Sequence, residues 1–119
     1  MKPHKKLNAW KMSFDIVKEL YSLTSKYPDV EKFGLISQIR RAAVSVPVNI
    51  AEGAARKSKK EFIYFLHISL GSLTELDTLV LLSADLEFIS KSESELIISK
   101  FDIIGKLIYG LIKSLDNKV

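Results

Sequence analysis

The chain has 119 residues with a net charge of +4; 47% of the residues are hydrophobic and 27% charged, a balance typical of one folded domain. Cysteine is absent, which excludes disulfides, iron–sulfur clusters and thiol nucleophiles. The basic N-terminus leads into no long apolar segment, and the uncharged stretch at 62–74 is shorter than the roughly 20 residues of a membrane span. We therefore expect a soluble, cytoplasmic protein with no membrane partner.

Hydrophobic residues recur at helical spacing along almost the whole chain, and no alternating pattern predicts a strand. The first predicted helix covers about residues 7–26 and carries two adjacent apolar stripes, so its buried face is wider than contact with one neighbour requires. One stripe contains Leu7, Trp10, Phe14, Val17 and Tyr21, and the other contains Met12, Ile16, Leu20 and Leu23. A break follows at Tyr27-Pro28-Asp29, because the residue before a proline avoids the helical region.

The second predicted helix covers about residues 30–57 and has two contrasting sides. Its apolar side is rich in small residues, which allow a neighbouring helix to approach closely: Leu35, Ile39, Ala42, Ala43, Val46 and Ile50. Opposite lies a polar stripe, within about 80° of arc, that consists of Gln38, Arg41, Ser45, Asn49, Glu52 and Arg56. Its short side chains favour a hydrogen-bonded contact over a free water-facing surface. Pro47 lies inside the pattern and predicts a kink, with two helices broken at Pro47 as the alternative.

Capping boxes, each a serine followed three residues later by a glutamate, mark the predicted starts of the last two helices. Ser58 and Glu61 begin the third helix, whose seam runs to about Ala84 and contains Phe62, Leu66, Ser69, Leu73, Leu76 and Val80. Ser92 and Glu95 begin the fourth helix. Its heptad seam contains Ile97, Phe101, Ile104, Ile108, Leu111 and Leu115, and a second stripe contains Leu96, Ile103 and Leu107.

Four helices of about 20–28 residues with short connections predict one all-α domain over residues 1–119, an up-down-up-down antiparallel four-helix bundle. The apolar stripes are broader than one bundle core requires. This excess predicts self-association through an outward-facing stripe.

Motifs of enzymes and metal centres are missing from the sequence. A di-iron bundle needs Glu-x-x-His pairs, but the histidines are His4 and His67, and Tyr64 stands three residues before His67. We interpret His67 as a bundle or interface residue. The acidic residues are interpreted as capping and ion-pairing groups: Glu52, Glu61, Glu75 and Asp77. With neither a Gly-x-Ser-x-Gly elbow nor a glycine-rich phosphate loop, we predict no catalytic residue, metal, cofactor or small-molecule substrate.

Basic residues gather in the first half of the chain, which carries +8 over residues 1–60 against −4 over residues 61–119. In an up-down bundle, the N-terminus and the connection between the second and third helices lie at the same end. We call this the basic end, and it contains Lys2, Lys5, Lys6, Arg56, Lys57, Lys59 and Lys60. The predicted phosphate-contacting residues are Lys5, Lys6, Arg40, Arg41, Arg56, Lys57, Lys59 and Lys60.

Such a patch neutralises phosphates without reading bases, so binding should be salt-dependent and weakly specific. No aromatic residue interleaves with these lysines, which argues against a platform for stacking single-stranded bases. The alternative interpretation is a charged, solvated bundle end that binds nothing.

The string Gln38-Ile-Arg-Arg-Ala-Ala-Val-Ser-Val-Pro-Val-Asn-Ile-Ala-Glu-Gly53 resembles the signature of a known family. Its members are encoded in intervening sequences of bacterial 23S rRNA genes and are often called the S23 ribosomal protein family. Further similar segments are Trp10-Lys11, Tyr27-Pro28-x-x-Glu31, Arg56-x-Ser58, Glu61-Phe62 and Gly71-Ser72-Leu73-x-Glu75-Leu76. The chain departs from the pattern at Val48, where relatives commonly carry a small polar residue, and at Ala54-Ala55, where many have an aromatic residue and a glycine.

This resemblance implies a left-handed four-helix bundle that assembles into a ring-shaped homopentamer without established enzymatic activity. It also implies similarity to the accessory protein of diversity-generating retroelements, a basic pentamer that engages reverse transcriptase and nucleic acid. We therefore predict a non-enzymatic, oligomeric RNA- or DNA-binding accessory protein whose patches gain avidity around the ring. The alternative is a homo-oligomeric scaffold whose polar stripe makes subunit contacts and whose basic end docks a protein.

Overall fold

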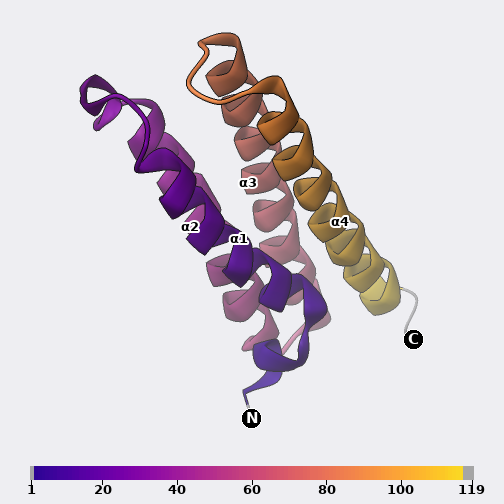
Figure 1. Cartoon of the computed structure of the whole chain (residues 1–119). Coiled ribbons are helices and arrows are strands. Elements are labelled where there is room, and N and C mark those ends of the chain that lie inside the picture. Colours follow the sequence, from indigo (N-terminus) through magenta and orange to yellow (C-terminus); the bar gives the residue numbers. More distant parts are fainter. Residues whose placement is uncertain (1, 117–119) are drawn as a thin grey trace.

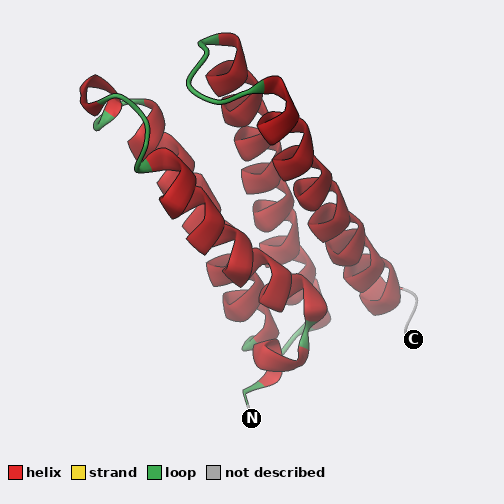
Figure 2. Cartoon of the chain, viewed as in Figure 1, coloured by secondary structure: helices red, strands yellow, loops and turns green. Residues whose placement is uncertain are grey.

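Four long helices and two short 3₁₀ turns make up the computed structural model, which describes residues 2–116 (Figures 1 and 2). In chain order they are η1 Pro3–Lys6, α1 Asn8–Thr24, η2 Asp29–Glu31, α2 Leu35–Ala54, α3 Lys59–Asp85 and α4 Lys91–Asp116. No strand occurs in residues 2–116. The predicted all-α, up-down-up-down four-helix bundle is confirmed, as a rod of 49 × 22 × 21 Å.

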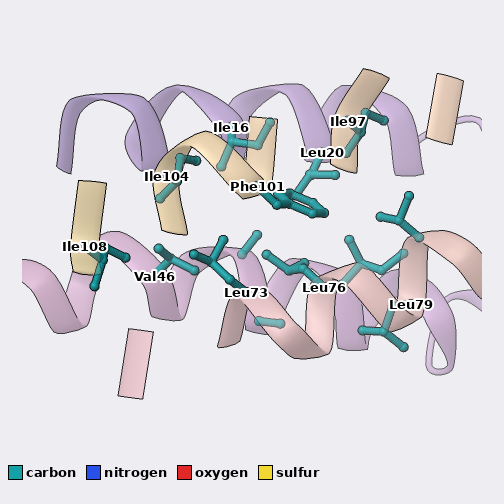
Figure 3. Close-up of a cluster of buried hydrophobic side chains, with 14 of the residues drawn as sticks. Ile16, Leu20, Val46, Leu73, Leu76, Leu79, Ile97, Phe101, Ile104 and Ile108 are labelled. Atoms are coloured by element: carbon teal, nitrogen blue, oxygen red, sulfur yellow. The ribbon is translucent and has the colours of Figure 1, made fainter. Parts of the chain in front are cut away.

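The helices form a ring in which each packs against its neighbours in the chain and α4 returns to α1. Figure 3 shows the core between them, with Ile16 and Leu20 from α1 facing Leu76 of α3 and Phe101 of α4. Each fully buried Leu or Ile side chain contributes about 1.5–3 kcal/mol to the free energy of unfolding. Contact between α1 and α4 is the sparsest of the four, and the two hairpins diverge toward the end that holds their turns (Figure 1).

A serine caps the N-terminus of each of the last two helices, and the predicted serine is the right one for α3 only. The Glu61 backbone N–H donates to the Ser58 hydroxyl at 3.1 Å, which confirms the cap of α3. The predicted cap at Ser92 is wrong, because α4 already begins at Lys91. There Ser90 and Glu93 form the complete capping box: the Glu93 N–H donates to the Ser90 hydroxyl at 3.0 Å, and the Ser90 N–H donates to the Glu93 carboxylate at 2.9 Å. This backbone N–H and the Ser90 hydroxyl lower the pKa of Glu93 below its ordinary value.

α2 begins five residues later than predicted and continues through Pro47. The residues before it form η2, and the Glu31 carboxylate accepts a hydrogen bond from the Leu35 N–H at 3.1 Å, so a side chain outside the helix satisfies one of its first donors. The alternative of two helices broken at Pro47 is therefore wrong. The kink expected at this proline stays a prediction.

The two apolar stripes of α1 have different surroundings. Ile16 and Leu20, from one stripe, are fully buried in the core, whereas Phe14 and Tyr21, from the other, are more than 40% exposed. A similar division holds on α4, where the predicted seam is buried from Ile97 to Ile108 and partly buried at Leu111 and Leu115, and Ile103 is half-exposed. The expected excess of apolar surface is therefore present on the outside of the bundle.

Tyr27 closes the turn between α1 and α2. Its ring is buried and packs against Phe88 with the centroids 5.4 Å apart, which ties this turn to the one between α3 and α4. The tyrosine hydroxyl is buried without a hydrogen-bond partner among the described residues. Burial is the main reason that the pKa of Tyr27 is raised.

Among the described helices, α3 alone has the length and apolar composition of a membrane span, and 39% of its most apolar window is buried within the bundle. These criteria are weak evidence, because core helices of water-soluble proteins also meet them. α3 packs along both α2 and α4 and places Leu66, Leu76 and Val80 in the core. This is the packing of a core helix.

Candidate nucleic-acid interface

The N-terminal segment and the connection between α2 and α3 lie at the same end of the bundle (Figure 1). η1 packs against the last turns of α2, where Pro3 and His4 share a shallow hollow with Val48 and Ala51. His4 also lies edge-on against the Trp10 ring at 4.9 Å, which holds η1 to α1. Chain topology therefore brings together the two groups of lysines that sequence reasoning assigned to the basic end.

At the basic end the lysines are exposed, whereas Arg56 contacts residues of α2 and α3. Within residues 2–116 the ion pairs involve none of the basic end's lysines, which are Lys2, Lys5, Lys6, Lys57, Lys59 and Lys60. Arg56 pairs with Glu52 at 2.9 Å and with Glu61 at 4.0 Å, and its guanidinium lies 5.0 Å from the centre of the Phe65 ring. The lysines are consequently the groups best placed to meet an external anion.

Arg40 and Arg41 lie away from this end. Arg56 follows Arg40 by 16 residues along α2 and its C-terminal cap, a separation of about 24 Å. The Arg40 guanidinium donates to the Thr24 hydroxyl at 2.9 Å and to the Tyr21 carbonyl at 3.2 Å, and it lies 4.5 Å from the centre of the Tyr21 ring. Arg40 thus joins α1 to α2, whereas Arg41 is exposed on the outer side of α2.

The polar stripe of α2 runs beside α3. The Ser72 hydroxyl of α3 donates to the Ser45 hydroxyl at 2.8 Å, and the Asn49 amide donates to the carbonyl and the hydroxyl of Ser45. Gln38 and Arg41 border the same groove as Ser72. The hydrogen-bonded contact expected from these short side chains is therefore made, at least at Ser45, within one copy of the chain.

Several exposed apolar residues near the turn between α1 and α2 were missed by sequence reasoning. Phe33 is 90% exposed and Val30 86% exposed, although both fell inside the predicted second helix. In the sequence, only Gly34, a weak helix former directly before Leu35, indicated that this helix begins later than predicted. Lys32 lies over the Phe33 ring at 5.7 Å.

Candidate residues for chemistry are dispersed. His67 is exposed on α3 and so lies outside the core of the bundle, and a role at an interface stays a prediction. Over the described part of the chain, no group of three or more His, Cys, Asp or Glu residues is placed to hold a metal ion. Glu52 and Glu61 have the ion-pairing and capping contacts expected of them.

Residues 5–110 match the family model described as 23S rRNA-intervening sequence protein. The chain belongs to this family. Among solved structures, it is similar to the crystal structure of a protein of unknown function from the S23 ribosomal protein family of Bacteroides thetaiotaomicron, with 25% sequence identity and a TM-score of 0.79. That match covers 88% of this chain and 98% of the other. Among curated proteins, no sequence matches. The family assignment made from residues 38–53 is thus confirmed, and this 23S rRNA-intervening sequence protein has the bundle of its solved relative.

Proposed function

We propose that this protein is a non-enzymatic, self-associating accessory protein of the cytoplasm that binds RNA or DNA through phosphate contacts at its basic end. One observation carries the proposal: the fold brings η1 and the α2–α3 connection together, so that six exposed lysines share one end. Charge of this kind attracts the nucleic-acid backbone irrespective of sequence. The core contact set is Lys5, Lys6, Lys57, Lys59 and Lys60, with Arg56 holding the hairpin beneath them.

Self-association supports this function, because several weak patches on one assembly gain avidity. The exposed apolar residues on α1, α2 and α4 support association between copies. The resemblance described above suggests a ring of five copies and, as a protein partner, a reverse transcriptase. Light scattering should then give five times the chain mass of 13.4 kDa.

The second candidate is a homo-oligomeric scaffold that docks proteins and no nucleic acid. It is favoured by the same apolar surface, of which Phe33 is the most exposed aromatic residue. In this case the basic end would meet an acidic protein surface. Binding to nucleic acid therefore separates the two candidates.

A salt titration of binding to generic duplex and structured RNA tests the proposal. We expect affinity to fall steeply with salt, and the variant Lys59→Glu/Lys60→Glu to flatten the slope of log affinity against log salt for the duplex by about 2, since each phosphate contact contributes about 0.9. These positions are in the first turn of α3, where glutamates favour the helix dipole, so the fold should persist.

The matched control is Lys26→Glu/Lys91→Glu, which changes the net charge equally at the opposite end of the bundle. It should bind with nearly the slope of the wild type. Absence of binding at about 50 mM salt, or equal losses in both variants, would reject the basic end as the binding surface and leave the scaffold as the better candidate.

A further inference from the structure

A continuous groove follows the outer seam between α1 and α2. Its upper part has a volume of about 750 Å³ and is lined by Tyr21, Phe33 and Arg41 among others, and its lower part has about 410 Å³ and is lined by Trp10 and Phe14. Val44 and Val48 line both parts, so the two join into one surface, which we call the α1/α2 face. Val48 is 54% exposed in its centre.

Charge on the α1/α2 face is positive. Lys32, Arg40 and Arg41 line the upper part, and no carboxylate from residues 2–116 does so. In the lower part Lys18 lies 5.4 Å from the centre of the Phe14 ring but pairs with Asp15 at 3.4 Å, so the positive charge of the face comes from its upper part. A partner for this face should therefore combine apolar side chains with carboxylates.

The opposite side of the bundle offers that combination. A groove of about 460 Å³ between α3 and α4 is lined by the apolar residues Leu70 and Leu73, by the carboxylates Asp77 and Asp102, and by Tyr109. Lys106 is the one basic residue among the described residues that line it. Because the helices form a ring in chain order, this α3/α4 face and the α1/α2 face lie on opposite sides of one copy.

We propose that the α1/α2 face of one copy packs against the α3/α4 face of a second copy. The inference rests on the self-association in the proposed function and assigns the two surfaces that make it. Since one copy carries both surfaces on opposite sides, the contact is head-to-tail and each copy has two neighbours. Arg41 lies about 9 Å along α2 from its start and Asp77 about 12 Å along α3 from its end, so copies standing parallel bring these charges to nearly the same height.

The aromatic residues of the α1/α2 face fit a protein partner better than nucleobases. Base stacking on a side chain needs an open ring face. The Arg40 guanidinium covers one face of Tyr21 at 4.5 Å, and the Trp10 and Phe14 rings pack against each other with their centroids 5.0 Å apart. The valines between these rings add apolar area that a nucleic-acid backbone does not use.

Two blocking variants and their mixture test this arrangement. Val48→Glu blocks the α1/α2 face, and Tyr109→Lys, which places a cation against the basic residues of that face, blocks the α3/α4 face; both residues are more than half exposed, so the bundle should fold, as circular dichroism would verify. By light scattering, we expect each variant alone to be monomeric. Mixed in equal amounts, they should form a dimer of one copy of each. One variant keeps an intact α3/α4 face and the other an intact α1/α2 face, so a single contact forms and no further copy can add.

Matched controls substitute apolar residues of similar exposure off both faces. Tyr64→Lys, at 63% exposure against 61% for Tyr109, and Ile103→Glu, at 48% against 54% for Val48, should keep the assembly of the wild type. If the wild type is oligomeric but the blocking variants stay oligomeric, or if the mixture of the two variants yields no dimer, the head-to-tail contact is wrong and the rest of the proposed function is unaffected. A monomeric wild type would overturn the self-association itself, while the RNA titration still decides the role of the basic end.

Discussion

The buried serine and threonine hydroxyls of this core donate to backbone carbonyls. Thr24, Ser83 and Ser94 donate to carbonyls three or four residues earlier in their own helices, at 2.6–2.8 Å. Ser69 is different, because it donates across the bundle from α3 to the Val46 carbonyl of α2 at 2.9 Å. An unpaired buried polar group costs about 1–3 kcal/mol, so these bonds let small polar residues occupy seam positions without that penalty.

Ser90 is the residue whose contacts define the start of α4. We expect Ser90→Ala to lower the free energy of unfolding by about 1 kcal/mol, the usual cost of losing a helix cap, because the Glu93 N–H then loses its acceptor. Urea denaturation would measure the change. Ser92→Ala is the control, since Ser92 makes only a hydroxyl contact to Ser90. A larger loss at Ser92 than at Ser90 would contradict the boundary described here.

Close approach of α2 and α3 depends on Gly53. A Cβ atom at this position would lie 2.9 Å from the Phe62 ring, 2.9 Å from the Phe65 Cβ and 3.2 Å from the Phe62 carbonyl oxygen. Phe62 and Phe65 of α3 therefore leave no room for a side chain at this position. The absence of a side chain at Gly53 therefore permits the close approach of α2 and α3 here.

A pair of glycine substitutions tests this contact. Gly53→Ala should destabilise the bundle by about 1–3 kcal/mol through overpacking. Gly71→Ala should instead stabilise it by roughly 0.5–1 kcal/mol, since its Cβ would meet no atom within 4 Å and alanine favours the helix. Thermal unfolding of both variants gives the comparison. If both substitutions stabilised the bundle, helix propensity alone would explain them and the packing argument would fail.

Sequence periodicity was sufficient for the type and order of the helices but not for two of their starts. Ser90-x-x-Glu93 and Ser92-x-x-Glu95 fit the same capping pattern, and only the path of the turn before them selects the first. At α2, the cap comes from the Glu31 carboxylate four residues before Leu35, a contact that no N-cap pattern contains.

Predicting the site from sequence had a comparable limit. Topology alone places the lysines of the basic end, because short connections fix which helix ends adjoin. By contrast, the partners of Arg40 are Thr24 and Tyr21 on α1, and they depend on how the two helices are rotated. Rotation also decides which stripe of α1 is buried, and both stripes are equally apolar in the sequence.

At the scale of the whole molecule, charge is separated both along and across the bundle. The basic end lies at one tip, while the two side faces carry opposite charge and apolar grooves. Head-to-tail contacts between parallel copies would leave the basic ends on one side of the assembly. Each copy then contributes one weak phosphate-binding patch to a larger surface.

This arrangement predicts that assembly, and not the single patch, sets affinity for long RNA. Val44→Glu blocks the same α1/α2 face outside the hollow that Val48 forms with η1 and keeps every lysine of the basic end, so its affinity for a duplex short enough to touch one copy should stay within about twofold of the wild type. For a long structured RNA we expect a loss of about 100-fold or more, because linked patches gain avidity of that order. Fluorescence anisotropy at one fixed salt concentration measures both. Equal affinity of the two proteins for the long RNA would show that one copy suffices.

The tight crossing at Gly53 has a consequence for the turn directly beyond it. Because Phe62 and Phe65 lie against Gly53, α2 cannot move relative to α3 there. Both ends of the short connection that contains Lys57 are therefore held in place. Binding of a polyanion would then restrict only the lysine side chains, because the backbone that carries them is already ordered. Much of the conformational entropy that binding would otherwise cost is thus already lost on folding.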